Sequence, residues 1–316
     1  MTLFWIAIFI ISLLVMLRGG EWFLDGAEKI GRFIGLSSFI IGATIVAIGT
    51  SLPELISGIF ATLQGATDIV TGNVIGSNIA NILLVMGVSA VIGRRLSIQK
   101  DLADLDLPLL AITTGLFVLI VWDRIITSPE ALILLVGQIV YIAYTLMHKD
   151  ELAVTEEDVL LPSENREKVS ALEILLFVVG GVGLILGSRY LVESVIQLSA
   201  IWGIAPGVIA ISAVALGTSL PELFVSVRAA LKGKAEVAFG NIFGSNVFNM
   251  LAVAGIPALI RPLALDDKTF AIGLPFLIVS TLLFIFSGLS RKMHIWEGLF
   301  FVLIYIFFTG KLFGFL

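Results

Sequence analysis

Two glutamates stand inside apolar stretches of this chain, in identical surroundings. The sequence Gly-Thr-Ser-Leu-Pro-Glu-Leu occupies residues 49–55 and again 217–223, so Glu54 and Glu222 each follow two hydroxyl residues and a proline. A carboxylate in hydrocarbon is costly, and an ionisable residue at such a place is by default a functional one. Single polar residues often only hold helices together, but repetition of the whole constellation predicts a paired acidic site.

The neighbours of each glutamate offer oxygen atoms. On a continuous helix Thr50 and Ser51 would share a face with Glu54, because residues three and four apart lie on one side. The proline has no N–H to donate and crowds the carbonyl four residues earlier, so we expect a kink that turns carbonyls of the preceding turn into a cavity. The expected ligands are Thr50, Ser51, Glu54 and the carbonyl of Ala47, with Thr218, Ser219, Glu222 and the carbonyl of Ala215 in the second copy.

A second motif also occurs twice, and its two copies are 168 residues apart, as are those of the first motif. Gly-Asn-Val-Ile-Gly-Ser-Asn-Ile-Ala-Asn at 72–81 corresponds to Gly-Asn-Ile-Phe-Gly-Ser-Asn-Val-Phe-Asn at 240–249, and residues 49–81 and 217–249 are identical at 16 of 33 positions. Within each copy a serine and an asparagine lie one turn apart on one face. These further candidate ligands are Ser77, Asn81, Ser245 and Asn249. The other four asparagines, Asn73, Asn78, Asn241 and Asn246, either bind ions or brace the helices, and bracing is favoured.

This set of ligands indicates which ions it would take. Hard oxygens without nitrogen or sulfur suit Ca²⁺, Na⁺ and Mg²⁺ rather than Zn²⁺ or Cu²⁺. Two ionised, unpaired glutamates in a dry site would cost several kcal/mol per ion. One Ca²⁺ cancels their charge, and so would two or three Na⁺, whereas an empty pocket would resist crossing the bilayer. The charge therefore favours exchange of one ion for another over a leak.

The elements that must position these residues are membrane spans. The chain has 316 residues, of which 58% are hydrophobic and 14% charged, with a mean hydropathy of +1.08. Because about 20 apolar residues cross a bilayer, the sequence predicts an all-α integral membrane protein with ten transmembrane helices. The predicted spans lie near residues 3–33, 37–63, 69–92, 105–121, 131–147, 172–198, 205–231, 237–260, 270–286 and 295–313. Five spans per copy make the second copy upside down, as two inverted five-helix repeats.

Loop charges give the orientation. The loops after spans 1, 3, 5, 7 and 9 hold 13 lysines and arginines, against 4 on the opposite face. By the positive-inside rule, this predicts a cell-membrane protein with both termini extracellular. The expected domains are a first repeat at 1–147, a cytoplasmic linker at 148–170 and a second repeat at 171–316. Small glycine pairs in both copies, Gly72 with Gly76 and Gly240 with Gly244, are expected to let helices approach closely.

Composition excludes several classes of site. The chain has no cysteine, which rules out disulfides, thiol catalysis and thiolate metal sites. Its two histidines, His148 and His294, fall in expected loops, where solvated histidines are the usual case. No cofactor, nucleic acid or obligate protein partner is indicated. The expected partners are Ca²⁺, Na⁺ and the lipid bilayer.

With both motifs present twice, the chain resembles the Ca²⁺/cation antiporter superfamily, and most of all the compact prokaryotic sodium/calcium exchangers. The resemblance implies four central ion sites, Glu54 and Glu222 as main ligands, spans 2, 3, 7 and 8 as the ion core, and spans 1 and 6 as the moving gate. Archaeal exchangers of known fold and the potassium-dependent branch have aspartate where this chain has Asn249. Because asparagine removes this negative charge, the chain resembles the potassium-independent exchangers at this position.

The expected function is a secondary active Na⁺/Ca²⁺ antiporter in which the two ions compete for one site, and the family's usual ratio of three Na⁺ to one Ca²⁺ would make it electrogenic. Three alternatives stay open. An H⁺/Ca²⁺ antiporter would protonate the same glutamates. An intramembrane hydrolase would use them as a general acid–base pair. In a structural scaffold, Glu54→Gln would alter stability alone.

Overall fold

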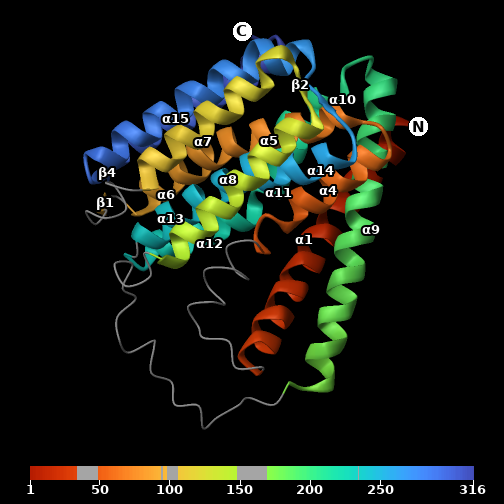
Figure 1. Ribbon diagram of the computed structural model, residues 1–316, viewed down its shortest axis with the longest axis horizontal. Helices are drawn as coiled ribbons and strands as arrows, with labels where there is room; N and C mark the ends of the chain where they lie inside the picture. The colour runs from red at the N-terminus through yellow and green to blue at the C-terminus, as the bar shows by residue number, and fades with distance from the viewer. Residues whose placement is uncertain (34–48, 94, 98–105, 148–168, 234) are drawn as a thin grey trace.

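The computed structural model describes residues 1–33, 49–93, 95–97, 106–147, 169–233 and 235–316, and helices make up most of it (Figure 1). Among these residues, seven helical stretches are long and apolar enough to cross a membrane, and an eighth qualifies if a bent pair counts as one span. The seven are α1 (Thr2–Phe33), α5 (Thr67–Ile79) with η2 (Ala80–Met86) and α6 (Gly87–Gly93), α8 (Ser128–Met147), α9 (Ala171–Trp202), α13 (Ala235–Phe248) with η7 (Asn249–Val253) and α14 (Ala254–Ile260), η8 (Thr269–Gly273) with α15 (Leu274–Leu289), and α16 (Ile295–Phe313).

The remaining predicted spans correspond to shorter or bent helices. The bent pair consists of α10 (Pro206–Ile209), η6 (Ala210–Val214) and α11 (Ala215–Thr218) on one side and α12 (Leu220–Leu231) on the other. Two shorter apolar helices are α4 (Leu52–Leu63) and α7 (Leu107–Ile120), which continues in η4 (Val121–Asp123). The first half of predicted span 2 lies outside the described residues. The helical class and the membrane-type helices are thus confirmed.

Corresponding elements of the two halves recur at nearly one offset along the whole described chain. The ends of α1 and α9, α7 and α15, and α8 and α16 differ by 166 to 169 residues. The offset of the duplicated motifs is 168. It therefore extends to the last two helices of each half, where the sequence retains no visible likeness.

Two short β-ladders join the halves at opposite ends of the bundle (Figure 1). At one end β1 (Arg95–Ser97) pairs antiparallel with β4 (Lys292–His294), and at the other β2 (Ile125–Ile126) pairs antiparallel with β3 (Leu263–Ala264). By the same offset β1 corresponds to β3 and β2 to β4. Each ladder therefore links a strand of one half to a strand of the other.

The helices that hold the second motif form the centre of the molecule. In the stretch Thr67–Gly93, 78% of the apolar window is buried, and in Val237–Ile260 the figure is 83%, against 17–39% for the other spanning helices. A Cβ on Gly72 would lie 2.5 Å from the Gly207 carbonyl oxygen, and one on Gly76 would lie 2.3 Å from that of Ile211. Only glycine permits such a close approach to another backbone.

The same expectation is wrong for the second copy. Among the described residues, a Cβ on Gly240 would meet no atom within 4 Å, and one on Gly244 would meet only the Tyr141 hydroxyl, at 3.7 Å. The corresponding glycines of the two copies therefore differ in what they contact. Gly72 and Gly76 contact α10 and η6, whereas in the described part of the chain no helix backbone approaches Gly240 or Gly244 in this way.

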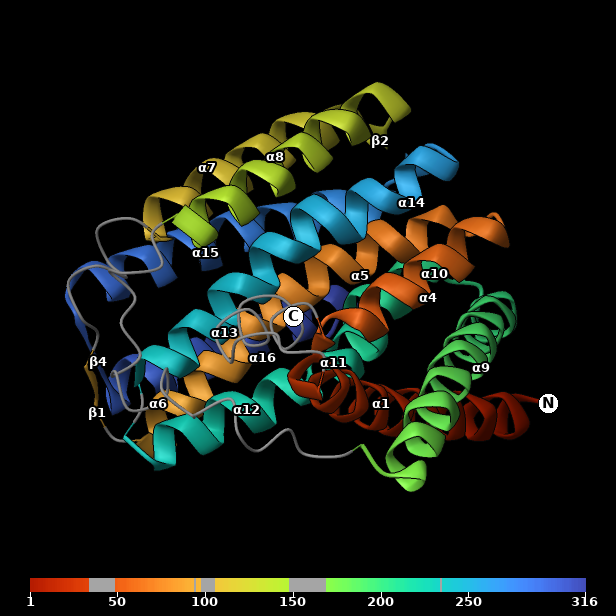
Figure 2. The ribbon, with the colours of Figure 1, turned by 60° about the horizontal axis from the view of Figure 1, so that its bottom comes forward.

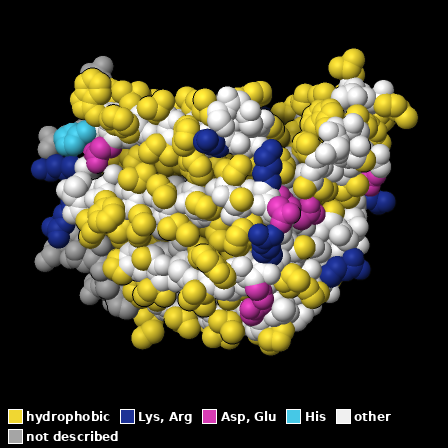
Figure 3. Space-filling model, turned by 90° about the horizontal axis from the view of Figure 1, so that it is seen from above, with side chains coloured by type: hydrophobic (Ala, Val, Ile, Leu, Met, Phe, Trp, Pro, Cys, Tyr) yellow, Lys and Arg dark blue, Asp and Glu magenta, His cyan; other side chains and the backbone are white. Residues whose placement is uncertain are grey.

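The two 32-residue helices α1 and α9 lie side by side and project away from the rest of the bundle (Figures 1 and 2). They touch through glycines: a Cβ on Gly19 would lie 2.6 Å from the Leu184 nitrogen, and one on Gly180 would lie 2.6 Å from the Phe23 nitrogen. Farther along, Lys29 and Glu173 form an ion pair of 2.7 Å. Hydrophobic side chains are spread over the face seen in Figure 3, and many large ones are exposed on α1, α9 and α16, as expected for a protein surrounded by lipid.

Candidate functional site

In both copies of the first motif a helix begins directly after the serine. In the second copy α11 ends at Thr218, α12 begins at Leu220, and the two arms of the pair are bent by 42°. Ser219 between them has φ −81° and ψ 3°, and Ser51 before α4 has nearly the same values, −94° and 9°. The kink predicted from the proline is confirmed in the second copy. Residues 34–48, which precede the break in the first copy, lie outside the described residues.

Each break begins a helix whose first turn contains the glutamate. Glu54 and Glu222 are both 0% exposed, and they lie close enough for their charges to repel each other. The free N–H groups at the start of a helix favour negative charge, so α4 and α12 partly offset the cost of burying a carboxylate. No lysine or arginine among the described residues forms an ion pair with either glutamate. Within the described residues, the site therefore holds two acidic groups without a basic partner.

Hydroxyl groups reach these carboxylates across the two copies. The Ser51 hydroxyl donates to Glu222 Oε1 at 3.4 Å, and Thr50 also faces Glu222. In the opposite direction Thr218 faces Glu54. Ser245 adds a bond to Glu222 Oε1 at 3.3 Å from within its own copy. Helix α4 begins at Leu52, so Thr50 and Ser51 precede it rather than lying on one helix with Glu54 as predicted, although the Leu55 N–H still donates to the Ser51 carbonyl at 3.2 Å.

The central helices supply a second layer of polar groups. Asn73 Oδ1 accepts hydrogen bonds from the Ser77 and Thr218 hydroxyls, both at 3.4 Å, and those two hydroxyls lie 3.5 Å apart. Asn81 Nδ2 donates to Asn246 Oδ1 at 3.1 Å, so the two copies also meet through amides. A network of this kind fixes side chains on different helices relative to one another.

The π-helical segments η2 and η7 widen the central helices where the motif ends. Asn81 lies within η2 and Asn249 opens η7. Single π-turns inside α-helices are frequent at functional sites. Both side chains are fully buried, so the widened turns present two amides to the interior of the bundle.

Many buried oxygens of this region have no hydrogen-bond partner among the described residues. They are Thr50 Oγ1, both carboxylate oxygens of Glu54, Asn78 Oδ1, Asn81 Oδ1, Ser219 Oγ, Glu222 Oε2 and Asn249 Oδ1. Buried polar groups are normally hydrogen-bonded, and each exception calls for an explanation. Coordination of a hard cation satisfies carboxylate, hydroxyl and amide oxygens together.

The outcome for the predicted ligands differs from residue to residue. Hydrogen bonds or electrostatic contacts connect a group of seven of them, and Asn81 is bonded to Asn246. The seven are Thr50, Ser51, Glu54, Ser77, Thr218, Glu222 and Ser245. Ser219 and Asn249 are buried without a hydrogen bond from their side chains among the described residues. The Ala215 carbonyl already accepts from the Ser219 N–H at 3.1 Å and the Thr218 hydroxyl at 3.4 Å. Ala47 lies outside the described residues.

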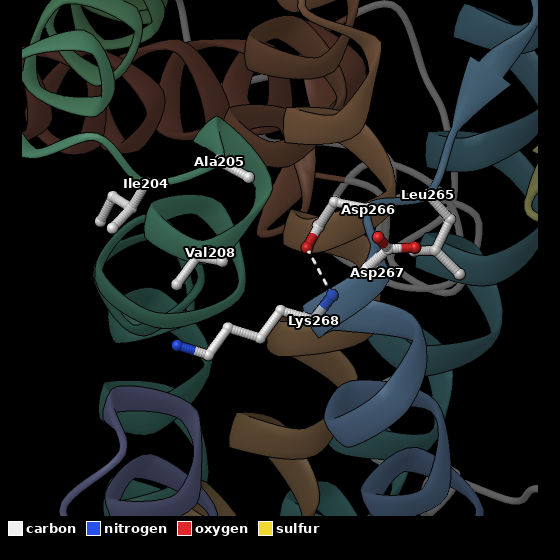
Figure 4. Close-up of a pocket in the computed structure, with 7 residues that line it drawn as sticks. All are labelled: Ile204, Ala205, Val208, Leu265, Asp266, Asp267 and Lys268. Atoms are coloured by element: carbon white, nitrogen blue, oxygen red, sulfur yellow. Dashed lines mark hydrogen bonds between the residues drawn. The ribbon is translucent and has the colours of Figure 1, made fainter.

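A surface cavity at one end of the bundle is separate from this region. It has a volume of about 460 Å³ and is lined by residues that include Val208, Asp266 and Lys268, between the loop before α10 and the loop before η8 (Figure 4). Neither glutamate lines it. The described residues contain no group of three or more histidine, aspartate or glutamate side chains that could hold a metal ion, so the paired glutamates and their neutral oxygens are the stronger candidate.

Comparison with known proteins gives a family match over nearly the whole chain. The family model described as "Sodium/calcium exchanger protein" matches residues 4–147 and 172–313. The sodium/calcium exchanger MaX1 of Methanosarcina acetivorans is 31% identical, with 97% of each chain covered. An uncharacterized membrane protein of Methanocaldococcus jannaschii, MJ0091, has the same identity and coverage. The inner membrane protein YrbG of Escherichia coli is 31% identical, over 84% of this chain and 82% of its own.

Solved structures of the sodium-calcium exchanger NCX_Mj have a similar fold. The form soaked with 10 mM Na⁺ and 10 mM Sr²⁺ gives a TM-score of 0.66 at 30% identity, with 97% of this chain and 98% of that one covered. The form soaked with zero Na⁺ and Ca²⁺ gives 0.64 at 29% identity, with 99% and 100% covered. The likeness therefore extends over the whole length of both chains.

Proposed function

Since the chain belongs to the sodium/calcium exchanger protein family, we propose that it is a secondary active Na⁺/Ca²⁺ antiporter that works by alternating access. The single observation that carries this proposal is the pair of fully buried glutamates from opposite copies, surrounded by oxygens without hydrogen-bond partners among the described residues. Two carboxylates and several neutral oxygens suit Ca²⁺, which takes six to eight oxygen ligands. Because Na⁺ uses the same ligand type, we infer that the two ions compete for Glu54 and Glu222.

The proposed ligand set comprises the residues predicted from the sequence. It consists of Thr50, Ser51, Glu54, Ser77, Asn81, Thr218, Ser219, Glu222, Ser245 and Asn249, with the carbonyls of Ala47 and Ala215. The amide at Asn249 leaves the pocket at two negative charges, which supports K⁺-independent exchange. Three Na⁺ against one Ca²⁺ would then move one net charge per cycle.

The proposed architecture has ten spans in two inverted repeats, residues 1–147 and 171–316, joined by a cytoplasmic linker at 148–170, with both termini outside. The near-constant offset between corresponding elements supports the repeat. It also supports five spans per half, because α4 and α7 occupy the places of the two spans that are too short to qualify by length.

The proposed gate is the pair α1 and α9. A Cβ on Gly49 would lie 2.2 Å from a Leu24 methyl, and one on Gly217 would lie 2.6 Å from a Leu13 methyl, so α1 packs against the glycine before each break. Leu13 and Leu24 are eleven residues apart and therefore on nearly the same face of α1. Movement of α1 would uncover one break or the other.

The test is uptake of radiolabelled Ca²⁺ into Na⁺-loaded proteoliposomes, with and without K⁺. Wild type should accumulate Ca²⁺ only with an outward Na⁺ gradient, and equally in both K⁺ conditions. Glu54→Gln and Glu222→Gln should each abolish uptake. Glu21→Gln serves as the matched control, because Glu21 is an exposed acid on α1 that pairs with Arg18. No Na⁺-driven uptake by the folded wild type would refute the proposal.

The same vesicles decide between Na⁺ and H⁺ as the coupling ion. Rapid uptake driven by a pH gradient in the absence of Na⁺ would support an H⁺/Ca²⁺ antiporter instead. Neutral hydroxyl and amide oxygens near both glutamates favour Na⁺, because a metal ion needs such ligands and a proton does not.

A further inference from the structure

The bent helix pair is held by a different central helix on each side of its break. The arms on either side of Ser219 are rotated by 42° relative to each other. Pro221 has no N–H, and the bend lies where its missing hydrogen bond would otherwise continue the helix. The side chains that fix each arm therefore determine the direction in which Glu222, at the start of the second arm, points.

Asn73 holds the first arm. It lies on α5, is 2% exposed, and accepts a hydrogen bond from the hydroxyl of Thr218, the last residue of α11, at 3.4 Å. The Ser77 hydroxyl donates to the same amide oxygen. The end of the first arm is thus connected to α5.

Asn241 holds the second arm. It lies on α13, and its amide nitrogen donates to the backbone carbonyl of Glu222 at 3.2 Å and to the Ser226 hydroxyl at 2.9 Å. Ser245, one turn farther along α13, donates to the Glu222 carboxylate. Backbone and side chain of this glutamate are both connected to the same neighbouring helix.

The two asparagines are counterparts at the repeat offset, yet they act on opposite arms of one helix pair. In the first copy, the backbone carbonyl of Glu54 is instead bonded by Ser57 of the same helix, at 3.0 Å. The position that corresponds to Ser226 is Gly58, which has no hydroxyl to accept a bond. Among the described residues, side-chain hydrogen bonds from the central helix to the glutamate-bearing helix of the same copy are therefore found in the second copy alone.

We propose that Asn73 and Asn241 are positioning residues that fix the bend of the pair α10–α12 and thereby the place of Glu222. The inference rests on the proposed transport function. Neither asparagine needs to touch an ion. A relative movement of α5 and α13 would be transmitted to the two arms and would change the bend between them, so the geometry around Glu222 depends on both central helices.

The experiment compares Asn241→Ala, Ser226→Ala and the double variant in Na⁺-loaded proteoliposomes. Half-saturating Ca²⁺ concentration, maximal rate and melting temperature are measured for each. Asn241→Ala removes two hydrogen bonds and should raise the half-saturating concentration about tenfold, whereas Ser226→Ala should raise it a few-fold. The effects should not add in the double variant, because the two side chains share one bond. Asn73→Ala should also raise the half-saturating concentration.

Ser89→Ala is the matched control. Ser89 is fully buried and donates to the Val85 carbonyl within its own helical stretch, so its loss removes a bond without disconnecting two helices. It should leave the half-saturating concentration unchanged. A purely structural asparagine would lower the melting temperature or the maximal rate alone, and a half-saturating concentration within about twofold of wild type in Asn241→Ala would overturn the proposal.

Two further outcomes keep the inference separate from the function on which it rests. If Asn241→Ala does not fold, Ser226→Ala decides, because it removes the hydrogen bond between Asn241 and Ser226 and leaves the asparagine in place. If wild type shows no Na⁺-driven uptake, the proposed function fails. If wild type transports but the half-saturating Ca²⁺ concentration of Asn241→Ala, or of Ser226→Ala where Asn241→Ala does not fold, stays within about twofold of wild type, the positioning role is refuted and the transport function stands.

Discussion

The close contact between α1 and α9 predicts that two adjacent glycines tolerate alanine very differently. A Cβ on Gly19 would lie 2.6 Å from the Leu184 nitrogen and 2.7 Å from the Gly180 oxygen, both backbone atoms that cannot rotate away. A Cβ on Gly20 would meet only side-chain atoms, at 3.6 and 3.8 Å, which is ordinary contact. The two substitutions change the helix composition identically.

The expected energies follow from these distances. Alanine in place of glycine favours a helix by up to about 1 kcal/mol, and both variants gain that amount. Gly19→Ala must in addition separate the helices by roughly 1 Å, and overpacking of this kind typically costs about 1–3 kcal/mol. The free energy of unfolding of Gly19→Ala should therefore lie about 1–3 kcal/mol below that of Gly20→Ala.

The measurement is unfolding of both variants in mixed micelles by titration with a denaturing detergent, together with Ca²⁺ uptake. Gly20→Ala should equal or exceed the stability of wild type and retain transport. Gly19→Ala should unfold earlier and lose transport, because α1 and α9 can no longer remain in register. Equal stability of the two variants would refute the inference that the helix backbones touch at Gly19.

Three other predictions concern the centre of the molecule. Asn249→Asp places a third carboxylate among buried oxygens, so Ca²⁺ uptake should become stimulated by K⁺; uptake that stays indifferent to K⁺ in vesicles would count against an ion-facing position 249. Ser245→Ala, which loses a bond to a carboxylate, should raise the half-saturating Ca²⁺ concentration several-fold, while Ser57→Ala, which loses a bond within its own helix, should not; equal effects would contradict this assignment. Gly76→Ala should lower the free energy of unfolding by about 1–3 kcal/mol, whereas Gly240→Ala should be tolerated. Thermal unfolding followed by size-exclusion chromatography measures both, and a less stable Gly240→Ala would contradict the prediction.

The duplicated motifs predicted the main features of the candidate site because their chemistry is local. A glutamate after a proline in an apolar run indicates a buried charge beside a broken helix, and the 42° bend near Pro221 has that origin. The repeat also indicated two equivalent contributions, and Glu54 and Glu222 are both fully buried beside each other. The helical class followed from composition alone.

Contacts between the copies could not be predicted in the same way. Helical spacing assigned Ser51 to Glu54, but α4 begins only after Ser51 and the serine hydroxyl donates to Glu222. The glycines of the second motif are identical in sequence, yet only Gly72 and Gly76 meet another backbone closely. Such differences depend on which helix lies opposite, and that information is spread over the whole chain rather than contained in a motif.

The two β-ladders affect how the molecule can be assembled. Because β1 pairs with β4 and β2 with β3, no described strand pairs with a strand of its own half. Each half likewise contributes only one of the two glutamates. The protein is in this sense a dimer whose subunits share one polypeptide. Either ladder can form only when both halves are in contact, because each needs one strand from each half.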